Sequence, residues 1–303
     1  MRENPLGRSG LTVSAVGLGC NNFGRRLDRA GARAVIDAAL DAGITHLDTA
    51  DIYGGDGASE RMIGELLDGR RDRVVLATKF GMRMGGDTGE PRGSRAYLRR
   101  AIDGSLHRLR TDRVDLYYYH EPDGVTPLSE TLGALAELAD EGKIRSFGVS
   151  NVEAAQLREA AQPGDDRLAA VQNEYNLLDR EAEDEVLPPA RELGIGFVPY
   201  FPLASGLLTG KFRRGEEPPA GTRMAARPER LTDATFDRIE ALAAFAAARG
   251  RTLLELAIAG LACQPGVASV IAGAMTPEQV RSNAAAAEWV LSADDLAALA
   301  EVR

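Results

Sequence analysis

Cysteine and histidine are scarce in this chain of 303 residues, which contains 2 cysteines and 3 histidines. The cysteines, Cys20 and Cys263, belong to no CxxC motif, so the sequence supports neither a disulfide framework nor a structural zinc site. A metal-dependent barrel hydrolase would need two histidines one residue apart on a strand, but the same-face neighbour of His46 is Asp48. We therefore expect a reducing compartment and no bound metal.

Positive charge and long hydrophobic runs are also lacking. The 36 basic residues are outnumbered by 45 acidic ones, which gives a net charge of -9 and a pI near 5.1. Such a chain is not expected to bind nucleic acid or an anionic membrane, so a polyanionic ligand would need a local cationic pocket. No uncharged apolar run could span a bilayer, and no signal-peptide pattern opens the chain. We expect a cytoplasmic monomer that acts on a small molecule.

Two glycine-rich phosphate motifs are absent as well. GLGCNNFG (residues 17–24) has Asn22 where a dinucleotide fingerprint needs its third glycine. SGLLTGKF (205–212) begins with Ser205 instead of the first glycine of a P-loop and ends with Phe212 instead of a magnesium-binding Ser or Thr. Neither a Rossmann domain nor a P-loop domain is predicted.

Short apolar runs alternate with amphipathic stretches along the whole chain, which predicts βα units around a parallel sheet. The expected strands are Val16–Leu18, Thr45–Asp48, Val74–Lys79, Val114–Tyr119, Ser146–Val149, Ala170–Asn173, Gly196–Tyr200 and Val267–Ile271. The expected helices are Arg29–Asp41, Ser59–Leu67, Ser94–Arg108, Leu128–Glu141, Val152–Ala161, Glu181–Leu193, Thr232–Arg249 and Pro277–Ala286. This number of strands in one domain, residues 1–303, predicts a closed (β/α)8 (TIM) barrel.

Three segments fall outside the repeat. LGRSGLTVS (6–14) predicts an N-terminal β-hairpin that caps the barrel floor, and Leu253–Ala262 and Ala293–Glu301 are expected to be extra C-terminal helices. The stretch 211–232 is rich in Pro, Gly and Arg and is long for a loop in a compact domain. Because it follows the C-terminal end of a strand, we interpret it as a lid over a ligand; the alternative is a solvated linker.

Ionisable side chains stand at the ends of successive predicted strands. In HLDTADIYG (46–54) a buried strand ends at Asp48, and Tyr53 follows in the loop. Lys79 ends the next strand, and His120 follows the one after it. The C-terminal ends of barrel strands meet at one mouth, so these side chains should converge there. Asp48 could be part of an acid–base site, a metal ligand or a helix N-cap, but the next helix begins only near Ser59 and the histidine pattern disfavours a metal.

The chain resembles the aldo-keto reductase superfamily, and most closely its bacterial branches, which are also similar to potassium-channel β-subunits. The resemblance covers essentially the whole chain and rests on motifs in the family's order and at its spacings. They are GITHLDTADIYG (43–54), ATKFG (77–81), DLYYYHEPD (115–123), GVSN (148–151), VQNEYN (171–176), YFPLASGLLTGK (200–211) and IAGAMTPEQVRSN (271–283).

The resemblance implies a catalytic tetrad of Asp48, Tyr53, Lys79 and His120 that reduces aldehydes or ketones. It also implies that NADP(H) lies extended across the barrel mouth. Carbonyl reduction needs a proton donor, and a phenol with a pKa of about 10 is a poor acid near pH 7. A neighbouring ammonium favours the phenolate, so Lys79, oriented by Asp48, would make Tyr53 a better acid. His120 would donate a hydrogen bond to the carbonyl oxygen.

The same resemblance implies the cofactor contacts. Tyr200 would stack on the nicotinamide, and Ser150, Asn151 and Gln172 would bind its carboxamide. The pyrophosphate would be lined by Leu203, Ser205, Leu208, Lys211 and Arg223. The adenosine end would be held by Gly273, Met275, Gln279 and Asn283. The implied residues are Gly19, Cys20, Asn21, Asp48, Ser150, Asn151, Gln172, Tyr200, Phe201, Pro202, Leu203, Ser205, Gly206, Leu208, Lys211, Arg223, Gly273, Met275, Gln279 and Asn283.

Three positions depart from the family pattern. Cys20 replaces a usual Thr or Ser, Met275 replaces a polar residue that usually faces the 2′-phosphate, and Ser282 replaces a common Glu. Arg281 could supply the contact to the 2′-phosphate that Met275 lacks, or it could face solvent. NADP(H) is therefore favoured, and NAD(H) remains possible.

The substrate pocket is expected to be lined by the loops 81–94 and 211–232 and by Asn22, Phe23, Tyr53, Phe80, His120, Glu121 and Tyr175. The substrate would be a small carbonyl compound. Three alternative functions remain: an NAD-linked sugar or alcohol dehydrogenase of the same fold, a Schiff-base aldolase using Lys79, and a cofactor-sensing partner subunit.

Overall fold

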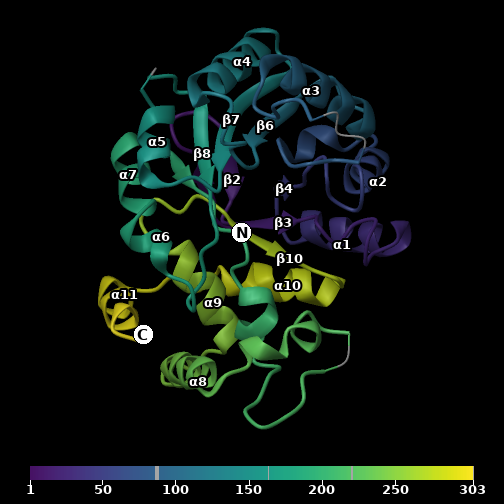
Figure 1. Ribbon diagram of the computed structural model, residues 1–303. Coiled ribbons are helices and arrows are strands. Elements are labelled where there is room, and N and C mark those ends of the chain that lie inside the picture. Colours follow the sequence, from purple (N-terminus) through teal and green to yellow (C-terminus); the bar gives the residue numbers. More distant parts are fainter. Residues whose placement is uncertain (86–88, 163, 220, 303) are drawn as a thin grey trace.

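Eight parallel strands form the centre of the computed structural model (Figure 1), which describes residues 1–85, 89–162, 164–219 and 221–302. They are β3 (Val16–Gly19), β4 (His46–Asp48), β5 (Val75–Phe80), β6 (Val114–Tyr119), β7 (Ile144–Ser150), β8 (Leu168–Gln172), β9 (Gly196–Phe197) and β10 (Val270–Gly273). They pair in the order β10-β3-β4-β5-β6-β7-β8-β9. Parallel bridges from Phe197 to Val267 and from Tyr200 to Ile271 join the two edges. The predicted (β/α)8 barrel is confirmed.

Helices surround the barrel and connect successive strands. They are α1 (Arg29–Asp41), α2 (Ala58–Leu66), α3 (Arg95–Leu109), α4 (Leu128–Asp140), α5 (Ala154–Ala160), α6 (Glu181–Asp184), α7 (Leu187–Leu193), α8 (Asp233–Ala247), α9 (Leu253–Ala262), α10 (Pro277–Ala286) and α11 (Ala293–Ala300). The predicted helix Glu181–Leu193 is in fact α6 and α7. Pro188 lies in the first turn of α7, where its missing N–H is tolerated, and it could not continue a preceding helix.

The order of the last helices differs from expectation. We predicted that Thr232–Arg249 belongs to the repeat and that Leu253–Ala262 lies outside it. Instead, α9 packs on β10 and α10 and is buried almost all round, whereas α8 lies on the outside of α9 (Figure 1). A helix that is apolar on every side is typically a buried one, which explains the placement of α9.

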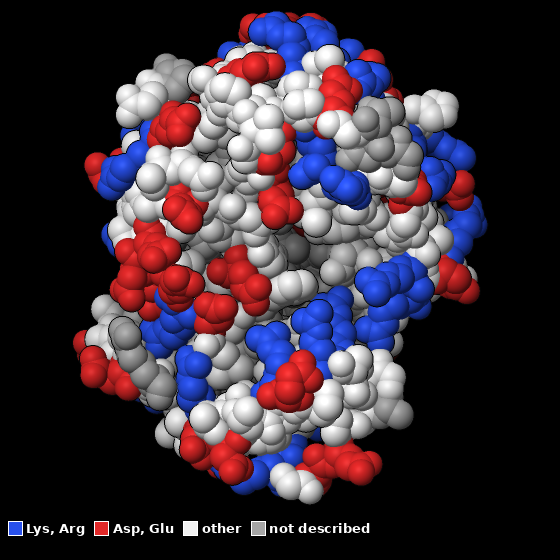
Figure 2. All heavy atoms as spheres, viewed as in Figure 1, with Lys and Arg blue, Asp and Glu red and all other residues white. Residues whose placement is uncertain are grey.

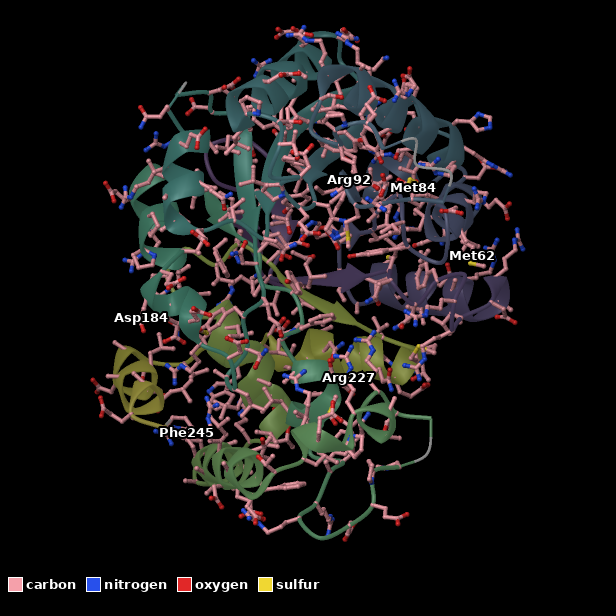
Figure 3. All side chains as sticks on the ribbon, in the orientation of Figure 1. Met62, Met84, Arg92, Asp184, Arg227 and Phe245 are labelled. Atoms are coloured by element: carbon pink, nitrogen blue, oxygen red, sulfur yellow. The ribbon has the colours of Figure 1, made fainter. Side chains whose placement is uncertain are left out.

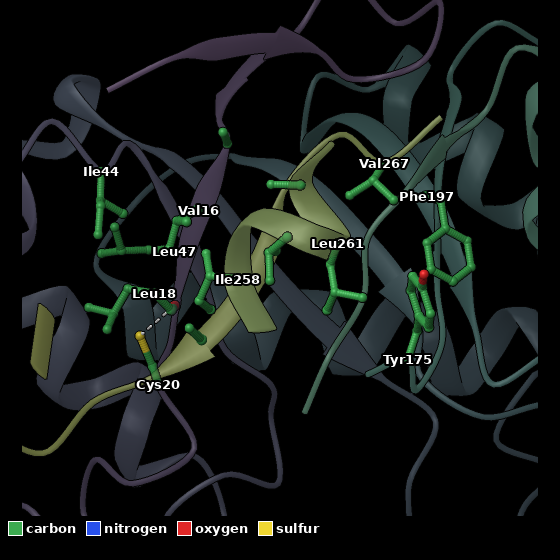
Figure 4. Close-up of a cluster of buried hydrophobic side chains, with 14 of the residues drawn as sticks. Val16, Leu18, Cys20, Ile44, Leu47, Tyr175, Phe197, Ile258, Leu261 and Val267 are labelled. Carbon is green, nitrogen blue, oxygen red and sulfur yellow. Dashed lines mark hydrogen bonds between the residues drawn. The ribbon is translucent and has the colours of Figure 1, made fainter. Parts of the chain in front are cut away.

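The barrel floor is closed by the N-terminal hairpin of β1 (Glu3–Pro5) and β2 (Thr12–Ser14). The Asn4 amide donates to the carbonyl of Ala268 at 2.9 Å. Leu6, Leu11 and Val13 are buried and belong to the cluster of apolar side chains inside the barrel. A second, larger cluster fills the space between the strands and the helices; Figure 4 shows part of it around Leu18, Leu47 and Ile258.

The segment that follows β9 and ends where α8 begins lies over the C-terminal end of the barrel. It contains the short 3-10 helices η2 (Ala204–Thr209), η3 (Met224–Ala226) and η4 (Pro228–Arg230); a further one, η1 (Arg71–Arg73), precedes β5. Arg214 ties this segment to α8 through Asp233, Asp237 and Glu240. No helix in the described part of the chain is long and apolar enough to cross a membrane.

Candidate active site

Four ionisable side chains meet at the C-terminal ends of β4, β5 and β6. The Lys79 ammonium lies 2.6 Å from Oδ2 of Asp48 and donates to the carbonyl of Thr49 at 2.9 Å. It also lies 5.1 Å from the centre of the Tyr53 ring. The Tyr53 ring meets His120 edge-on, with 5.8 Å between the ring centres. The strand-end residues predicted from the sequence are therefore brought together.

The backbone fixes this arrangement. Asp48 and Lys79 both point into the barrel because side chains alternate along paired strands. Beyond β4 the chain remains attached to β5, since the Thr49 amide donates to Ala77 and the Asp51 amide to Lys79. The turn then brings Tyr53 back over Lys79.

Burial dominates the electrostatics of the site. Burial lowers the pKa of Lys79, but the carboxylate of Asp48 and the phenol of Tyr53 outweigh it and leave this pKa raised. Burial also raises the pKa of Tyr53, while Lys79 opposes the rise by its charge and by a hydrogen bond. Lys79 thus acts in the expected direction without making Tyr53 a stronger acid than a free phenol, and Tyr53 stays protonated at neutral pH.

His120 is neutral as well. Burial, assisted by the charge of Lys79, lowers the pKa of His120 to about 3. Its Nδ1 is buried and has no hydrogen-bond partner among the described residues. A neutral imidazole can donate a hydrogen bond to a ligand oxygen without adding charge to the site. His46, by contrast, is buried in the barrel interior, where its Nδ1 pairs with the Ser269 hydroxyl at 3.0 Å.

These side chains face a cavity of about 990 Å³ that extends across the barrel mouth. This volume is at the upper end for small-molecule sites, so the cavity can hold a large, extended ligand. Asp48, Tyr53 and His120 line it directly, whereas Lys79 lies fully buried behind them. The predicted cofactor residues that also line it are Gly19, Asn21, Ser150, Asn151, Gln172, Tyr200, Phe201, Pro202, Leu203, Ser205, Gly206, Lys211, Arg223, Gly273, Met275, Gln279 and Asn283.

A cationic cluster of Arg26, Lys211 and Arg223 lines one part of this cavity. Burial lowers the pKa of Lys211, and the charges of Arg26 and Arg223 lower it further. Arg223 is affected in the same way by burial and by neighbouring arginines. No acidic side chain among the described residues pairs with the cluster. Like charges held together without counterions form a site for an anion.

The cationic cluster is held by the segment that follows β9. Arg26 donates to the carbonyl of Gly221 at 2.7 Å, and the Arg223 guanidinium lies 5.6 Å from the centre of the Phe201 ring. Figure 2 shows a hollow in this face with Lys and Arg side chains gathered along one side. Arg227, labelled in Figure 3, lies between η3 and η4, across the barrel opening from Arg92 and Met84.

Around Tyr200 the cavity wall carries polar groups in fixed positions. The Tyr200 hydroxyl donates to Oδ1 of Asn151 at 2.6 Å, and the Asn151 amide donates to the carbonyl of His120 at 2.9 Å. The Gln172 amide donates to Oδ1 of Asp48 at 3.0 Å. Asn151, Phe201 and Ser205 have left-handed φ angles of 56°, 55° and 58°. Such strain in residues other than glycine is concentrated at ligand sites.

The opposite end of the cavity lies between β10 and α10. The Met275 amide donates to Oε1 of Gln279 at 2.8 Å. Arg281, the cation that could compensate for Met275, does not line the cavity; its side chain is mostly exposed and pairs with Glu278 at 2.8 Å. Glu278 itself lines the cavity. The end of the cavity between β10 and α10 therefore has less positive charge for a 2′-phosphate than the sequence alone suggested.

Several predicted contacts are not at the cavity. Phe80 follows Lys79 on β5, so it points outward and stacks on Tyr117 and Tyr119. Tyr175 is fully buried, packs edge-on against Phe197 and donates to Glu183 at 2.5 Å (Figure 4). Cys20, Leu208 and Phe23 are buried in the core, and Glu121 is exposed outside the cavity lining. In the loop 81–94 Met82 lines the cavity, whereas 86–88 lie outside the described residues.

The structure adds residues that we did not predict. Arg26 belongs to the cationic cluster, although nothing in the local sequence distinguishes it from Arg25. Glu278 follows Pro277 at the start of α10, and an acid in a first helical turn is ordinarily explained by the helix dipole. Further lining residues that were not predicted are Thr209, Thr252, Leu254 and Ile271, whereas Gly221 and Thr222 belong to the predicted loop 211–232 and Ser282 was one of the departures from the family pattern.

Known proteins share this architecture. The model of the aldo/keto reductase family matches residues 15–303. A probable voltage-gated potassium channel subunit beta of Oryza sativa subsp. japonica is 38% identical over 300 residues, covering 93% of this chain and 90% of the relative. An uncharacterized oxidoreductase, YrpG, of Bacillus subtilis is 37% identical over 316 residues, covering 100% and 96%.

A solved structure gives the same result. The aldo-keto reductase AKR11C1 from Bacillus halodurans, in its holo form, superposes with a TM-score of 0.85 at 33% sequence identity. The match covers 100% of this chain and 96% of that one. Fold and sequence agree, and the chain belongs to the aldo/keto reductase family of oxidoreductases.

Proposed function

We propose that this protein reduces aldehydes or ketones to alcohols with NADPH, and that it does so as a cytoplasmic monomer. The observation that supports the proposal best is that one cavity is lined both by three members of the tetrad, Asp48, Tyr53 and His120, and by a cationic cluster without an acidic partner among the described residues. An acid–base group alone would suit many reactions. A neighbouring site for a polyanion favours a phosphorylated cofactor bound beside the reacting group.

The cavity lining suits a nicotinamide dinucleotide. Arg26, Lys211 and Arg223 would hold the phosphates, and Tyr200 would stack on the nicotinamide. Ser150, Asn151 and Gln172 would hold the carboxamide, with Gln172 exchanging its bond to Asp48 for one to the ligand. Gly273, Gln279 and Asn283 would hold the adenosine end. When bound, the reduced nicotinamide supplies the hydride.

The tetrad supplies the proton and positions the carbonyl group. Tyr53 is protonated at neutral pH and would donate its hydroxyl proton to the carbonyl oxygen as negative charge develops there. Neutral His120 would donate a hydrogen bond to the same oxygen and fix its angle. Lys79 would stabilise the phenolate that Tyr53 leaves behind, and Asp48 keeps Lys79 charged and oriented. Asn22 and Met82 line the space in which a small carbonyl compound would lie.

The Schiff-base aldolase is disfavoured by the state of Lys79. A Schiff base requires a neutral, accessible amine. Lys79 is fully buried, is paired with Asp48 and has a raised pKa. A partner subunit without turnover is disfavoured because all members of the tetrad are in place.

The first prediction concerns cofactor choice. We expect NADPH to bind about tenfold more tightly than NADH, which corresponds to roughly 1.4 kcal/mol. The preference is limited because Met275 offers no charge and Arg281 does not line the cavity. Replacing Glu278→Gln should remove a negative charge from the cavity lining and increase NADPH affinity while leaving NADH affinity nearly unchanged. Titration of both cofactors by fluorescence quenching measures these affinities. Equal or tighter binding of NADH by the unmodified protein would instead favour an NAD-linked dehydrogenase.

The second prediction concerns the cationic cluster. Arg223→Ala should weaken NADPH binding by about ten- to a hundredfold, since a hydrogen bond to a charged group contributes roughly 1.5–3 kcal/mol. The melting temperature of the free protein should stay the same or rise, because Arg223 is repelled by its cationic neighbours. Arg213→Ala, an exposed arginine of the same segment that does not line the cavity, is the matched control. Equal effects of the two variants would show that only general charge matters.

A further inference from the structure

A second group of buried polar side chains lies on the other side of the barrel wall from the tetrad. It consists of Asp51, Glu60, Thr78, Arg108 and Tyr117, which we call the wall cluster. The side chains lie between β4–β6 and the helices α2 and α3, and Asp51, Glu60, Thr78 and Tyr117 are 0% exposed. None of them lines the cavity.

The wall cluster shares its backbone with the tetrad. Thr78 precedes Lys79 in β5, and the Asp51 amide donates to the carbonyl of Lys79 at 3.1 Å. Asp51 begins the turn that brings Tyr53 over Lys79, and the Tyr53 carbonyl accepts from the Ser59 amide at 3.1 Å. A change at Asp51 is therefore transmitted to Tyr53 through a single short turn.

The cluster contains more carboxyl groups than cations to pair with them. Glu60 accepts from the Thr78 hydroxyl and from Arg108, each at 2.6 Å. Both oxygens of Asp51, and the hydroxyl of Tyr117, have no hydrogen-bond partner among the described residues. A buried carboxylate without a partner is costly, whereas the protonated acid costs much less and can donate to a neighbouring oxygen.

The charged and titratable groups around Asp51 also favour its protonated form. Burial raises the pKa of Asp51 to about 8, and the carboxylate of Glu60 on α2 adds to the rise. Arg108 on α3 opposes it, followed by the backbone amide of the adjacent Ile52 and, to the smallest extent, by Lys79 on β5. Tyr117 on β6 is uncharged, because burial holds its pKa well above the ordinary value.

We propose that Asp51 is a positioning residue for the proton donor Tyr53, and that it acts in its protonated, uncharged form. If Asp51 ionised, its carboxylate would need water or a cation, and the turn would have to move off the wall to provide either. Tyr53 would move with it. The positioning of Tyr53 rests on the proposed function, whereas the buried proton does not.

The pH dependence has a defined sign. The folded pKa of about 8 is above the ordinary value of 3.8, so the folded state retains a proton that the unfolded chain loses. The stability associated with Asp51 is complete below about pH 4 and is lost as the pH rises through about 8. Asp51→Asn keeps the shape and neutrality of the protonated acid and removes this dependence.

The experiment compares three proteins: the unmodified chain, Asp51→Asn and the control Asp68→Asn, which changes an exposed aspartate at the end of α2. We measure melting temperatures from pH 6 to pH 9. The unmodified chain and the control should lose several degrees relative to Asp51→Asn as the pH rises. A difference in melting temperature between Asp51→Asn and the unmodified chain that is the same at every pH would reflect only how well the asparagine amide fits the site. Parallel curves for all three proteins would overturn the proposal.

A direct measurement does not depend on the variant. With aspartate labelled at its carboxyl carbon, the infrared band of a protonated carboxylic acid should persist at pH 7 and titrate with a midpoint near 8. Absence of this band would overturn the proposal even if Asp51→Asn failed to fold. Carbonyl reduction by Asp51→Asn relative to the unmodified chain should rise between pH 7 and pH 9. If the infrared band is present but the ratio of the two reduction rates does not change with pH, the positioning role of Asp51 would be overturned. Absence of any carbonyl reduction would count against the proposed function alone.

Discussion

Replacing Tyr53→Phe should lower carbonyl reduction by about two to four orders of magnitude, the usual effect of losing a positioned acid. The ring would keep its contact with His120, 5.8 Å away, and its place over Lys79. Only the hydroxyl and its proton are removed. NADPH affinity should change little, because the expected phosphate contacts are with the cationic cluster. Steady-state reduction and a fluorescence titration of NADPH separate the two effects.

Tyr175→Phe is the matched control for this variant. It removes the hydroxyl of another buried tyrosine, whose partner is Glu183 and which does not line the cavity. It should cost roughly 1.5–3 kcal/mol of stability, as for a hydrogen bond to a charged group. The rate of reduction should stay within about twofold, because Tyr175 does not line the cavity. A Tyr53→Phe variant that reduces carbonyls at the original rate would exclude Tyr53 as the proton donor. Loss of NADPH binding would make it a binding residue.

Replacing Lys79→Met should reduce activity by a comparable factor, because the phenolate left by Tyr53 would have no neighbouring cation. This variant should also be unstable. Asp48 would be left as a buried carboxylate without its ion-pair partner, which typically costs about 3–5 kcal/mol. Loss of activity could therefore be confused with loss of folding.

A double variant separates these effects. Asp48→Asn combined with Lys79→Met removes both charges, and the new amide oxygen can still accept from Gln172, which donates to Asp48 at 3.0 Å. We expect the double variant to regain most of the melting temperature and none of the activity. Asp48→Asn alone should also lower stability and activity, because Asp48 is the main group that keeps the buried Lys79 charged. Recovery of activity together with stability would show that Lys79 is only structural.

The barrel and the meeting of the strand-end side chains could be predicted from the sequence because both depend on regular spacing, whereas the tetrad and its roles were implied by the resemblance to the family. Alternating apolar strands and amphipathic helices determine the fold class, and the strand ends then bring Asp48, Lys79 and His120 to one mouth. The same rules contained signals that we did not use. Phe80 is adjacent to Lys79 on a strand and must point the other way. Pro188 and Pro189 marked the break between α6 and α7.

Other features depend on contacts between distant parts of the chain. Arg26 joins the cationic cluster because its segment meets Gly221, which is 195 residues away. Arg281 does not line the cavity and its side chain is mostly exposed, which depends on how α10 packs against the barrel. Asp51 stands in an irregular turn, where alternation no longer predicts which way a side chain points. The net effect of burial on Tyr53 also depends on the three-dimensional surroundings, whereas the effect of a neighbouring lysine could be anticipated from the motif.

In the proposed reaction a hydride and a proton reach a carbonyl group inside this cavity. The most direct measurement uses NADPH deuterated at the transferable position, together with a panel of small aldehydes, ketones and sugars, and follows the label by mass spectrometry. We predict that at least one alcohol product carries deuterium at the former carbonyl carbon with the unmodified chain, and that Tyr53→Phe forms this product at least about a hundredfold more slowly. NADPH that binds but transfers no label to any member of the panel would contradict the account, as would a borohydride-trapped substrate adduct on Lys79.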